Sequence, residues 1–156
     1  MPNAEKEVTT FSIPPYFVPY ENKGWAKDWL AKHNVSLDAK WPLGNLIRTD
    51  VRNNRLVFLC YNPFSNEYVD AVGRSNKEKP KWLRYGTSRQ GFYYNGRPYN
   101  LCKRVVVVED ALSAVCISHA VHGVVGYALM GTSMSEEQRA FLAKAPCPII
   151  ICLDRD

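Results

Sequence analysis

Three apolar runs in the last third of the chain constrain its fold more than any other feature. The runs are RVVVV at 104–108, VVGYALM at 124–130 and PIIICL at 148–153. Continuous stretches rich in β-branched residues are typical of parallel strands that are buried on both faces. Segments with a helical pattern, 111–121 and 135–144, separate the runs. The sequence therefore predicts a β-α-β-α-β unit with right-handed crossovers, that is, an α/β fold with a parallel sheet.

Both predicted helices carry boundary signals. Ser135 and Gln138 have the spacing of a capping box, in which each side chain bonds the backbone of the other residue. Gly123 follows the first helix, at a position where glycine commonly ends helices. The helix boundaries therefore agree with the strand pattern.

The first two thirds of the chain are predicted to be mainly β, which makes the whole protein α+β. We divide the chain into an arm with a short helix at 1–43, a small basic β subdomain at 44–103 and the α/β unit at 104–156. Within the second part, RLVFLCYN and EYVDAVGR flank a turn signal and predict a hairpin. The arm is rich in proline and aromatic residues, and we expect the aromatic residues to pack on the protein's own core: Phe11, Tyr16, Phe17 and Tyr20.

Charge is distributed unevenly along the chain. The chain has 20 Lys and Arg and 15 Asp and Glu, a net charge of +5. Residues 1–43 contain five basic and five acidic side chains, 44–104 contain twelve and four, and 105–156 contain three and six. A basic middle and an acidic end favour a protein that binds a polyanion beside a cluster of carboxylates. The alternative explanation is that the charged side chains serve only solubility.

Acidic residues follow two of the predicted buried strands. Glu109 and Asp110 come directly after 104–108, and Asp154 and Asp156 come after the third strand. Parallel strands present their carboxyl ends at one sheet edge, where ligands of such sheets bind. Clustered carboxylates at that edge suit Mg²⁺ or Mn²⁺, which prefer oxygen ligands. A single acidic strand end would be better explained as solvated, whereas two at one edge favour a metal site.

The segment from Arg104 to Asp156 resembles the Toprim module of bacterial-type DNA primases, topoisomerases and related nucleases. The likeness includes the glutamate after the first strand, the turn Gly131-Thr132-Ser133 and the final Asp-x-Asp. The LMGTSMSEEQ stretch favours the primase branch, and VVEDALSA is similar to bacteriophage primases and primase–helicases. Toprim modules usually continue beyond this point, so the resemblance implies a module truncated at its carboxyl end.

The resemblance implies that Glu109, Asp154 and Asp156 bind Mg²⁺ or Mn²⁺ and catalyse template-directed joining of ribonucleotides on single-stranded DNA, with Glu109 acting also in proton transfer. Its implied partners are single-stranded DNA, nucleoside triphosphates and a helicase or a complementary primase chain. Many primases have glycine after the glutamate and an acid three residues further on. Here these positions are Asp110 and Ser113, and Asp110 is the candidate to supply the displaced charge.

The basic subdomain resembles the one that precedes Toprim in phage primases, including the K-P-K-W-L run. The residues that we expect to bind nucleic acid or nucleotide phosphates are Arg74, Lys77, Lys79, Lys81 and Arg84. Trp82 and Tyr85 lie among them and could stack on unpaired bases. The alternative is a solvated basic loop, with Trp82 packed in the core.

Other function classes remain open or are disfavoured. The alternatives are a Toprim nuclease or topoisomerase-like strand-cleaving protein, and a non-catalytic accessory fragment of a split primase–helicase that binds single-stranded DNA. The five cysteines are odd in number and no pair has C-x-x-C spacing, which argues against a disulfide framework or a zinc site. With no apolar run of membrane-spanning length and no signal peptide pattern, we expect a cytoplasmic protein without a membrane partner, in the host cytoplasm if it is encoded by a phage.

Overall fold

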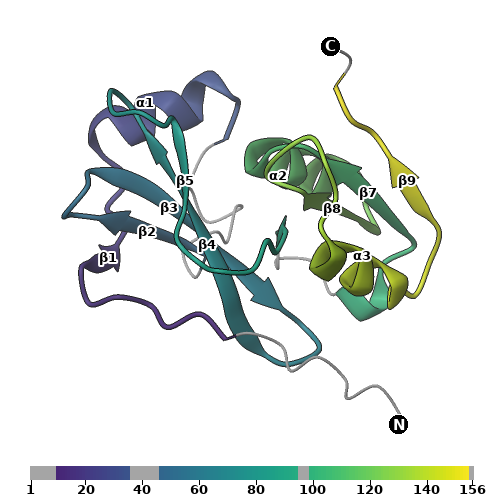
Figure 1. The fold of residues 1–156 in the computed structure, drawn as a ribbon. Helices are drawn as coiled ribbons and strands as arrows, with labels where there is room; N and C mark the ends of the chain where they lie inside the picture. The colour runs from purple at the N-terminus through teal and green to yellow at the C-terminus, as the bar shows by residue number, and fades with distance from the viewer. Residues whose placement is uncertain (1–9, 36–45, 95–98, 155–156) are drawn as a thin grey trace, which may run out of the picture.

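Two β-sheets and three α-helices make up the part of the chain that the computed structural model describes, which is residues 10–35, 46–94 and 99–154 (Figure 1). The antiparallel sheet has the order β1-β2-β3-β4-β5, and the mixed sheet has the order β6-β8-β7-β9. The predicted α/β class, α+β overall, is confirmed. None of the described helices is long and apolar enough to cross a membrane.

The antiparallel sheet consists of β1 (Phe17–Pro19), β2 (Ile47–Asp50), β3 (Arg55–Asn62), β4 (Glu67–Ser75) and β5 (Trp82–Arg84). The mixed sheet consists of β6 (Phe92–Tyr93), β7 (Arg104–Val108), β8 (Val124–Ala128) and β9 (Ile149–Ile151). The helices are α1 (Gly24–Lys32), α2 (Ala111–Ala120) and α3 (Glu136–Ala143), and a single 3₁₀ turn, η1 (Tyr99–Leu101), precedes β7.

β3 and β4 form the hairpin that the sequence predicts. Their register runs from the Arg55–Ser75 pair to the Asn62–Glu67 pair. In the turn, Oδ1 of Asn62 accepts a hydrogen bond from the Phe64 amide at 2.8 Å. Asparagine stabilises such turns because its short side chain can bond the backbone two residues on.

β7 is the central strand of the three parallel strands and is buried on both faces, as predicted. It pairs in parallel with β8 on one side and with β9 on the other. Val105 and Val107 pack in one apolar cluster with Phe141 of α3, whereas Val108 packs in another with Val115 of α2. Because successive strand residues point to opposite faces, the two helices cover opposite faces of the mixed sheet.

α2 lies between the two sheets and joins them into one core. Its buried side chains share an apolar cluster with Ile47 and Phe58 of the antiparallel sheet. On its other side it approaches β8 so closely that a Cβ atom at Gly126 would lie 2.5 Å from the Ala114 carbonyl oxygen. Ser118 satisfies the polar groups at this contact, since its Oγ donates to Ala114 and accepts from the Gly126 amide.

Ser135 and Gln138 form the predicted capping box at the start of α3. Oγ of Ser135 accepts from the Gln138 amide at 3.1 Å, and Oε1 of Gln138 accepts from the Ser135 amide at 2.9 Å. The buried Gln138 also donates to the Leu129 carbonyl at 2.8 Å, which ties the helix start to the end of β8. α2 ends at Ala120, and Gly123 follows with a φ of +80°.

β9 differs from the prediction of a third strand buried on both faces. Ile149, Ile150 and Ile151 are 38%, 49% and 55% exposed. The strand is also shorter than the predicted run of 148–153 and lies at the sheet edge, where it pairs with β7. An apolar run predicts a strand, but its burial requires a covering layer, and the described elements leave these side chains partly open. The prediction of burial was therefore wrong.

The described part of the aromatic arm packs on the protein's own core, as predicted. Phe17 is 6% exposed and lies in a cluster with Val57 and Leu59 of the antiparallel sheet. The Phe11 amide donates to the Tyr68 carbonyl at 2.8 Å, so the arm also has a backbone bond to β4.

Candidate functional site

Glu109 and Asp154 lie at the same edge of the mixed sheet, which we call the acidic edge. Glu109 directly follows β7, and Asp154 comes three residues after the end of β9. The two strands are adjacent and parallel, with Val107 paired to Ile151, so their carboxyl ends meet. Glu109 is half-buried and Asp154 is exposed. Asp156, the third predicted catalytic residue, lies outside the described residues.

The strand order reverses at the acidic edge. From β7 the chain passes through α2 to β8 on one side, and then crosses through α3 to β9 on the other side of β7. Open α/β sheets bind ligands outside the carboxyl ends of the strands where the order reverses in this way. Carboxylate oxygens at such a position have the donor chemistry that Mg²⁺ or Mn²⁺ prefers.

The described residues supply two of the three predicted metal ligands. Within residues 10–35, 46–94 and 99–154, no group of three Asp, Glu, His or Cys side chains is arranged to hold a metal ion. Metal binding by Glu109, Asp154 and Asp156 therefore stays a prediction, in which the oxygen-only donor set fits a hard divalent cation.

Asp110 caps α2 and binds Ser113. Oδ1 of Asp110 accepts from the Ser113 amide at 2.9 Å, and Oδ2 accepts from the Ser113 hydroxyl at 2.8 Å. A carboxylate at this position satisfies an amide of the first helical turn that otherwise has no partner. Asp110 and Ser113, the two positions at which the sequence departs from the pattern of many primases, are thus hydrogen-bonded to each other.

The predicted phosphate-binding residues differ in exposure. Lys77, Lys79 and Lys81 are exposed on the loop between β4 and β5, whereas Arg74 on β4 and Arg84 on β5 are half-buried. The three lysines form a cationic loop whose charges are open to solvent.

Arg84 has a carboxylate partner inside the protein. Its Nη1 donates to Oδ2 of Asp70, which is fully buried, and to the Gln90 carbonyl at 3.0 Å. Asp70 also accepts from the amides of Ala71 and Gly86 at 2.8 and 3.0 Å. Burial raises the pKa of Asp70, and the positive charge of Arg84 opposes that shift. Arg84 therefore neutralises a buried carboxylate, and its binding of phosphate stays a prediction.

A cavity of ≈ 370 Å³, which we call the tryptophan cavity, lies between the antiparallel sheet, α1 and the start of α2. Its lining comes from α1, β4, β5 and α2 and includes Trp29, Arg74, Trp82 and Asp110. The Arg74 guanidinium lies 5.1 Å from the ring centroid of Trp29 and 5.4 Å from that of Trp82. Nε of Arg74 is buried without a hydrogen-bond partner among the described residues, and burial lowers the pKa of this guanidinium. The cavity thus has an arginine with a buried, unpaired donor beside two aromatic rings that also contact each other.

Trp29 is a residue of this cavity that the sequence does not predict as part of the site. Its spacing predicts only that it belongs to the apolar face of a short helix, and no sequence signal places that helix beside Arg74. Trp82 packs against the core, which is one of the two roles that the sequence left open, and it also lines the tryptophan cavity. Its stacking on bases stays a prediction.

A second cavity, of ≈ 540 Å³, is lined by cations from two loops. Arg52 comes from the turn between β2 and β3, and Lys77 and Lys79 come from the loop between β4 and β5. The Arg52 guanidinium lies 4.2 Å from the ring centroid of Tyr16. The basic surface is therefore broader than the sequence predicts, because the antiparallel sheet brings together loops that are distant in the chain.

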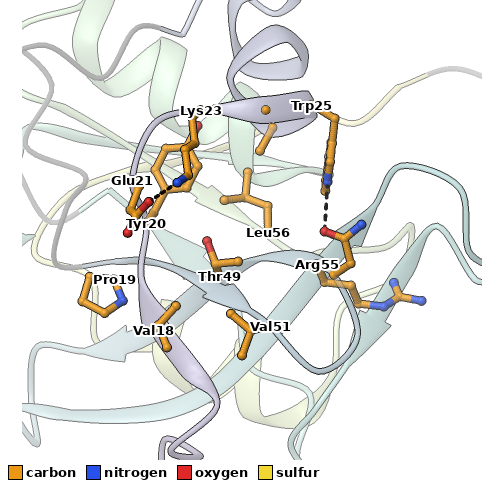
Figure 2. A pocket seen from close by; sticks show the side chains of 13 residues that line it. Val18, Pro19, Tyr20, Glu21, Lys23, Trp25, Thr49, Val51, Arg55 and Leu56 are labelled. Atoms are coloured by element: carbon orange, nitrogen blue, oxygen red, sulfur yellow. Dashed lines mark hydrogen bonds and ion pairs between the residues drawn. The ribbon is translucent and has the colours of Figure 1, made fainter.

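A third cavity, of ≈ 370 Å³, lies between the start of α1 and strands β1 and β2 (Figure 2). Lys23 and Glu21 form an ion pair of 2.5 Å at its rim, and Nε1 of Trp25 donates to Oδ1 of Asn54 at 3.4 Å. None of the predicted site residues that the structure describes lines this cavity.

Comparison with known proteins gives structural neighbours. No protein-family model and no curated protein matches the sequence. The structure is similar to that of the DnaG catalytic core, with a TM-score of 0.59 and 19% identity, over 84% of this chain and 55% of that one. It is also similar to the DnaG primase catalytic domain bound to single-stranded DNA, with a TM-score of 0.52 and 21% identity, over 90% of this chain and 49% of that one.

A DNA primase domain from Pseudomonas aeruginosa is a further neighbour, with a TM-score of 0.51 and 19% identity over 71% of this chain and 39% of that one. This chain has a primase-like fold. It spans about half the length or less of these neighbours, 55%, 49% and 39%. The predicted likeness to primase catalytic cores is confirmed for the fold, while the Toprim assignment and the bacteriophage type stay predictions.

Proposed function

We propose that this chain is part of a DNA primase catalytic core that joins ribonucleotides on single-stranded DNA. The observation that carries the proposal is the position of Glu109 and Asp154 at the carboxyl ends of adjacent parallel strands, in a sheet with a primase-like fold. The neighbour bound to single-stranded DNA supports a single-stranded template. The sequence resemblance adds the Toprim and bacteriophage assignments, and a helicase or second primase chain as partner.

In the proposed reaction the 3′-hydroxyl of the primer attacks the α-phosphate of the next nucleotide, and pyrophosphate leaves. In this proposal Glu109, Asp154 and Asp156 would hold Mg²⁺ or Mn²⁺, which would lower the pKa of the hydroxyl and stabilise the developing negative charge. Glu109 is half-buried at the end of β7, where its carboxylate can take up the proton that the hydroxyl loses.

We assign binding of the template and the nucleotides to the basic subdomain at 44–103. Lys77, Lys79 and Lys81 would bind template phosphates from their exposed loop, which is a contribution independent of sequence and sensitive to salt. Arg74 and Trp82 line the tryptophan cavity next to Asp110, so we assign them to the nucleotide nearest the acidic edge. An arginine beside aromatic rings offers both a phosphate donor and a stacking surface for a base.

The test is primer synthesis on single-stranded DNA with Mg²⁺ and labelled ribonucleotides, comparing the wild type with Asp154→Ala. We expect synthesis to be lost in Asp154→Ala, while DNA binding by fluorescence anisotropy persists or improves because a negative charge has been removed. Asp28→Ala removes an exposed acid of α1 as the matched control and should keep both activities.

The alternatives give different results in the same assay. Degradation of DNA with Mn²⁺, without any use of ribonucleotides, would replace the primase proposal with a strand-cleaving enzyme. DNA binding without either reaction, with synthesis restored by a second chain, would assign this protein as an accessory subunit. Equal primer synthesis by Asp154→Ala and the wild type would refute the assignment of the acidic edge.

A further inference from the structure

Two cysteine thiols that are distant in the sequence lie against each other beside β7. Sγ of Cys102 is 3.4 Å from Sγ of Cys147, and both thiols are free. Cys102 lies between η1 and β7, and Cys147 lies between α3 and β9. A disulfide bond is about 2.05 Å long, so the sulfurs need to approach by roughly 1.4 Å to form one.

The surroundings hold the two cysteines together. The Val105 amide donates to the Pro148 carbonyl at 3.1 Å, and these residues lie close in sequence to Cys102 and Cys147, respectively. Both cysteines contact one apolar cluster that includes Tyr99, whose buried hydroxyl has no hydrogen-bond partner among the described residues. Cys102 is 8% exposed and Cys147 is half-buried, so a small reagent reaches Cys147 first.

We propose that Cys102 and Cys147 form a reversible disulfide by exchange with a low-molecular-weight disulfide such as oxidised glutathione. The Cys147 thiolate attacks one sulfur of glutathione disulfide and releases one glutathione thiolate. The Cys102 thiolate then attacks the Cys147 sulfur of the mixed disulfide and releases the second glutathione. Two protein thiols are oxidised, one glutathione disulfide is reduced, and the two protons pass to the released glutathione thiolates.

The bond would connect the start of β7 to the segment that enters β9. β9 lies at the sheet edge with partly exposed isoleucines, and it leads to Asp154 at the acidic edge. Oxidation would therefore hold β9 more firmly on β7. The proposal depends only on the thiol pair and stands whether or not the chain is a primase.

The test uses the full chain carrying Cys152→Ser, because Cys147 and Cys152 fall on the same tryptic peptide, 145–155. The protein is incubated with glutathione disulfide, and the remaining thiols are blocked with N-ethylmaleimide before mass spectrometry. We expect the protein to lose two hydrogen atoms and peptide 90–103 to be linked to 145–155. Adding Cys116→Ser should leave the link intact, whereas adding Cys102→Ser should stop the reaction at the mixed disulfide.

Two further measurements test the mechanism and its consequence. Burial and the neighbouring Cys147 raise the pKa of the Cys102 thiol, so formation of the link should accelerate about tenfold per pH unit from pH 7 to 9. Backbone amides of β9 should exchange with deuterium several times more slowly in the oxidised protein than in the reduced protein.

Alkylation of both thiols after oxidation, or a stable mixed disulfide on Cys147 while Cys102 is present, would overturn the proposal. These outcomes come from protein that retains both cysteines, so they do not depend on how Cys102→Ser folds. A link that forms without changing the exchange of β9 would overturn the proposed effect on that strand.

Discussion

Asp70→Ala should lower the free energy of unfolding by about 3–5 kcal/mol, the range for breaking a buried ion pair by removing one partner. Asp70 is fully buried and accepts hydrogen bonds from Arg84 and from three backbone amides, those of Ala71, Gly86 and Gln90. Alanine would leave these donors without their acceptor, and the Arg84 side chain, 20% exposed, would reach water only in part. A domain is stable by about 5–15 kcal/mol in total, so the loss would be a large fraction of the stability.

Urea unfolding monitored by tryptophan fluorescence measures this effect. With a slope of about 2 kcal/mol per molar urea, the midpoint should fall by roughly 1.5–2.5 M. Glu67→Ala is the matched control, since Glu67 is an exposed acid on the same strand, and its removal should change stability by less than about 0.5 kcal/mol.

The double variant Asp70→Leu with Arg84→Met should be more stable than Asp70→Ala, because it leaves no unpaired charge. It also keeps the test available if Asp70→Ala fails to fold. A midpoint for Asp70→Ala no lower than that of Glu67→Ala would refute the reasoning, because it would show that the ion pair does not hold the antiparallel sheet together.

Three further predictions concern the template surface, pH and packing. Lys79→Ala should make the slope of log affinity for single-stranded DNA against log salt concentration shallower by about 0.7 for each phosphate that the lysine no longer neutralises. Anisotropy titrations at several salt concentrations measure this slope. The control Lys144→Ala, directly after α3, should leave the slope unchanged. Burial opposes ionisation of Asp50, but the hydrogen bonds that its carboxylate accepts lower the pKa of Asp50 overall. The ionised side chain therefore stabilises the fold above the unfolded pKa of about 3.9, and this stabilisation is lost as the pH falls through the lower folded pKa. The stability difference between the wild type and Asp50→Asn in urea should therefore be constant above about pH 5 and shrink as the pH falls below about 4. A difference that stays constant down to about pH 3 or lower would contradict this assignment. Gly126→Ala should cost about 1–3 kcal/mol in thermal unfolding, because its Cβ atom would overlap the Ala114 carbonyl of α2.

Features encoded within a few residues could be predicted from the sequence. The β-branched run at 104–108 indicated a strand buried on both faces, and β7 is such a strand. Ser135 and Gln138 indicated the start of α3, since a capping box needs only neighbouring backbone groups. The placement of Glu109 and Asp154 at one edge followed from the parallel topology.

Features that depend on contacts between distant segments could not be predicted in the same way. Nothing near Arg84 in the sequence reveals that Asp70 is its partner, because the hairpin and β5 bring the two together. The apolar run of β9 gave no information on its exposure, which depends on the layer above the strand. The odd cysteine count argued against a disulfide framework, yet the fold brings Cys102 and Cys147 into contact.

The sequence by itself determined the β3–β4 hairpin, the alternating strands and helices of the parallel unit, and the carboxylates that follow its strands. These properties follow from hydrophobic periodicity and helix caps, which act over a few residues. Only the tertiary structure decided that Arg84 neutralises Asp70, that Arg74 lies beside Trp29 and Trp82, and that the thiols of Cys102 and Cys147 meet. Ion pairs, ring contacts and contacts between thiols act over a few ångströms. Only folding brings residues of different elements to within such distances of each other.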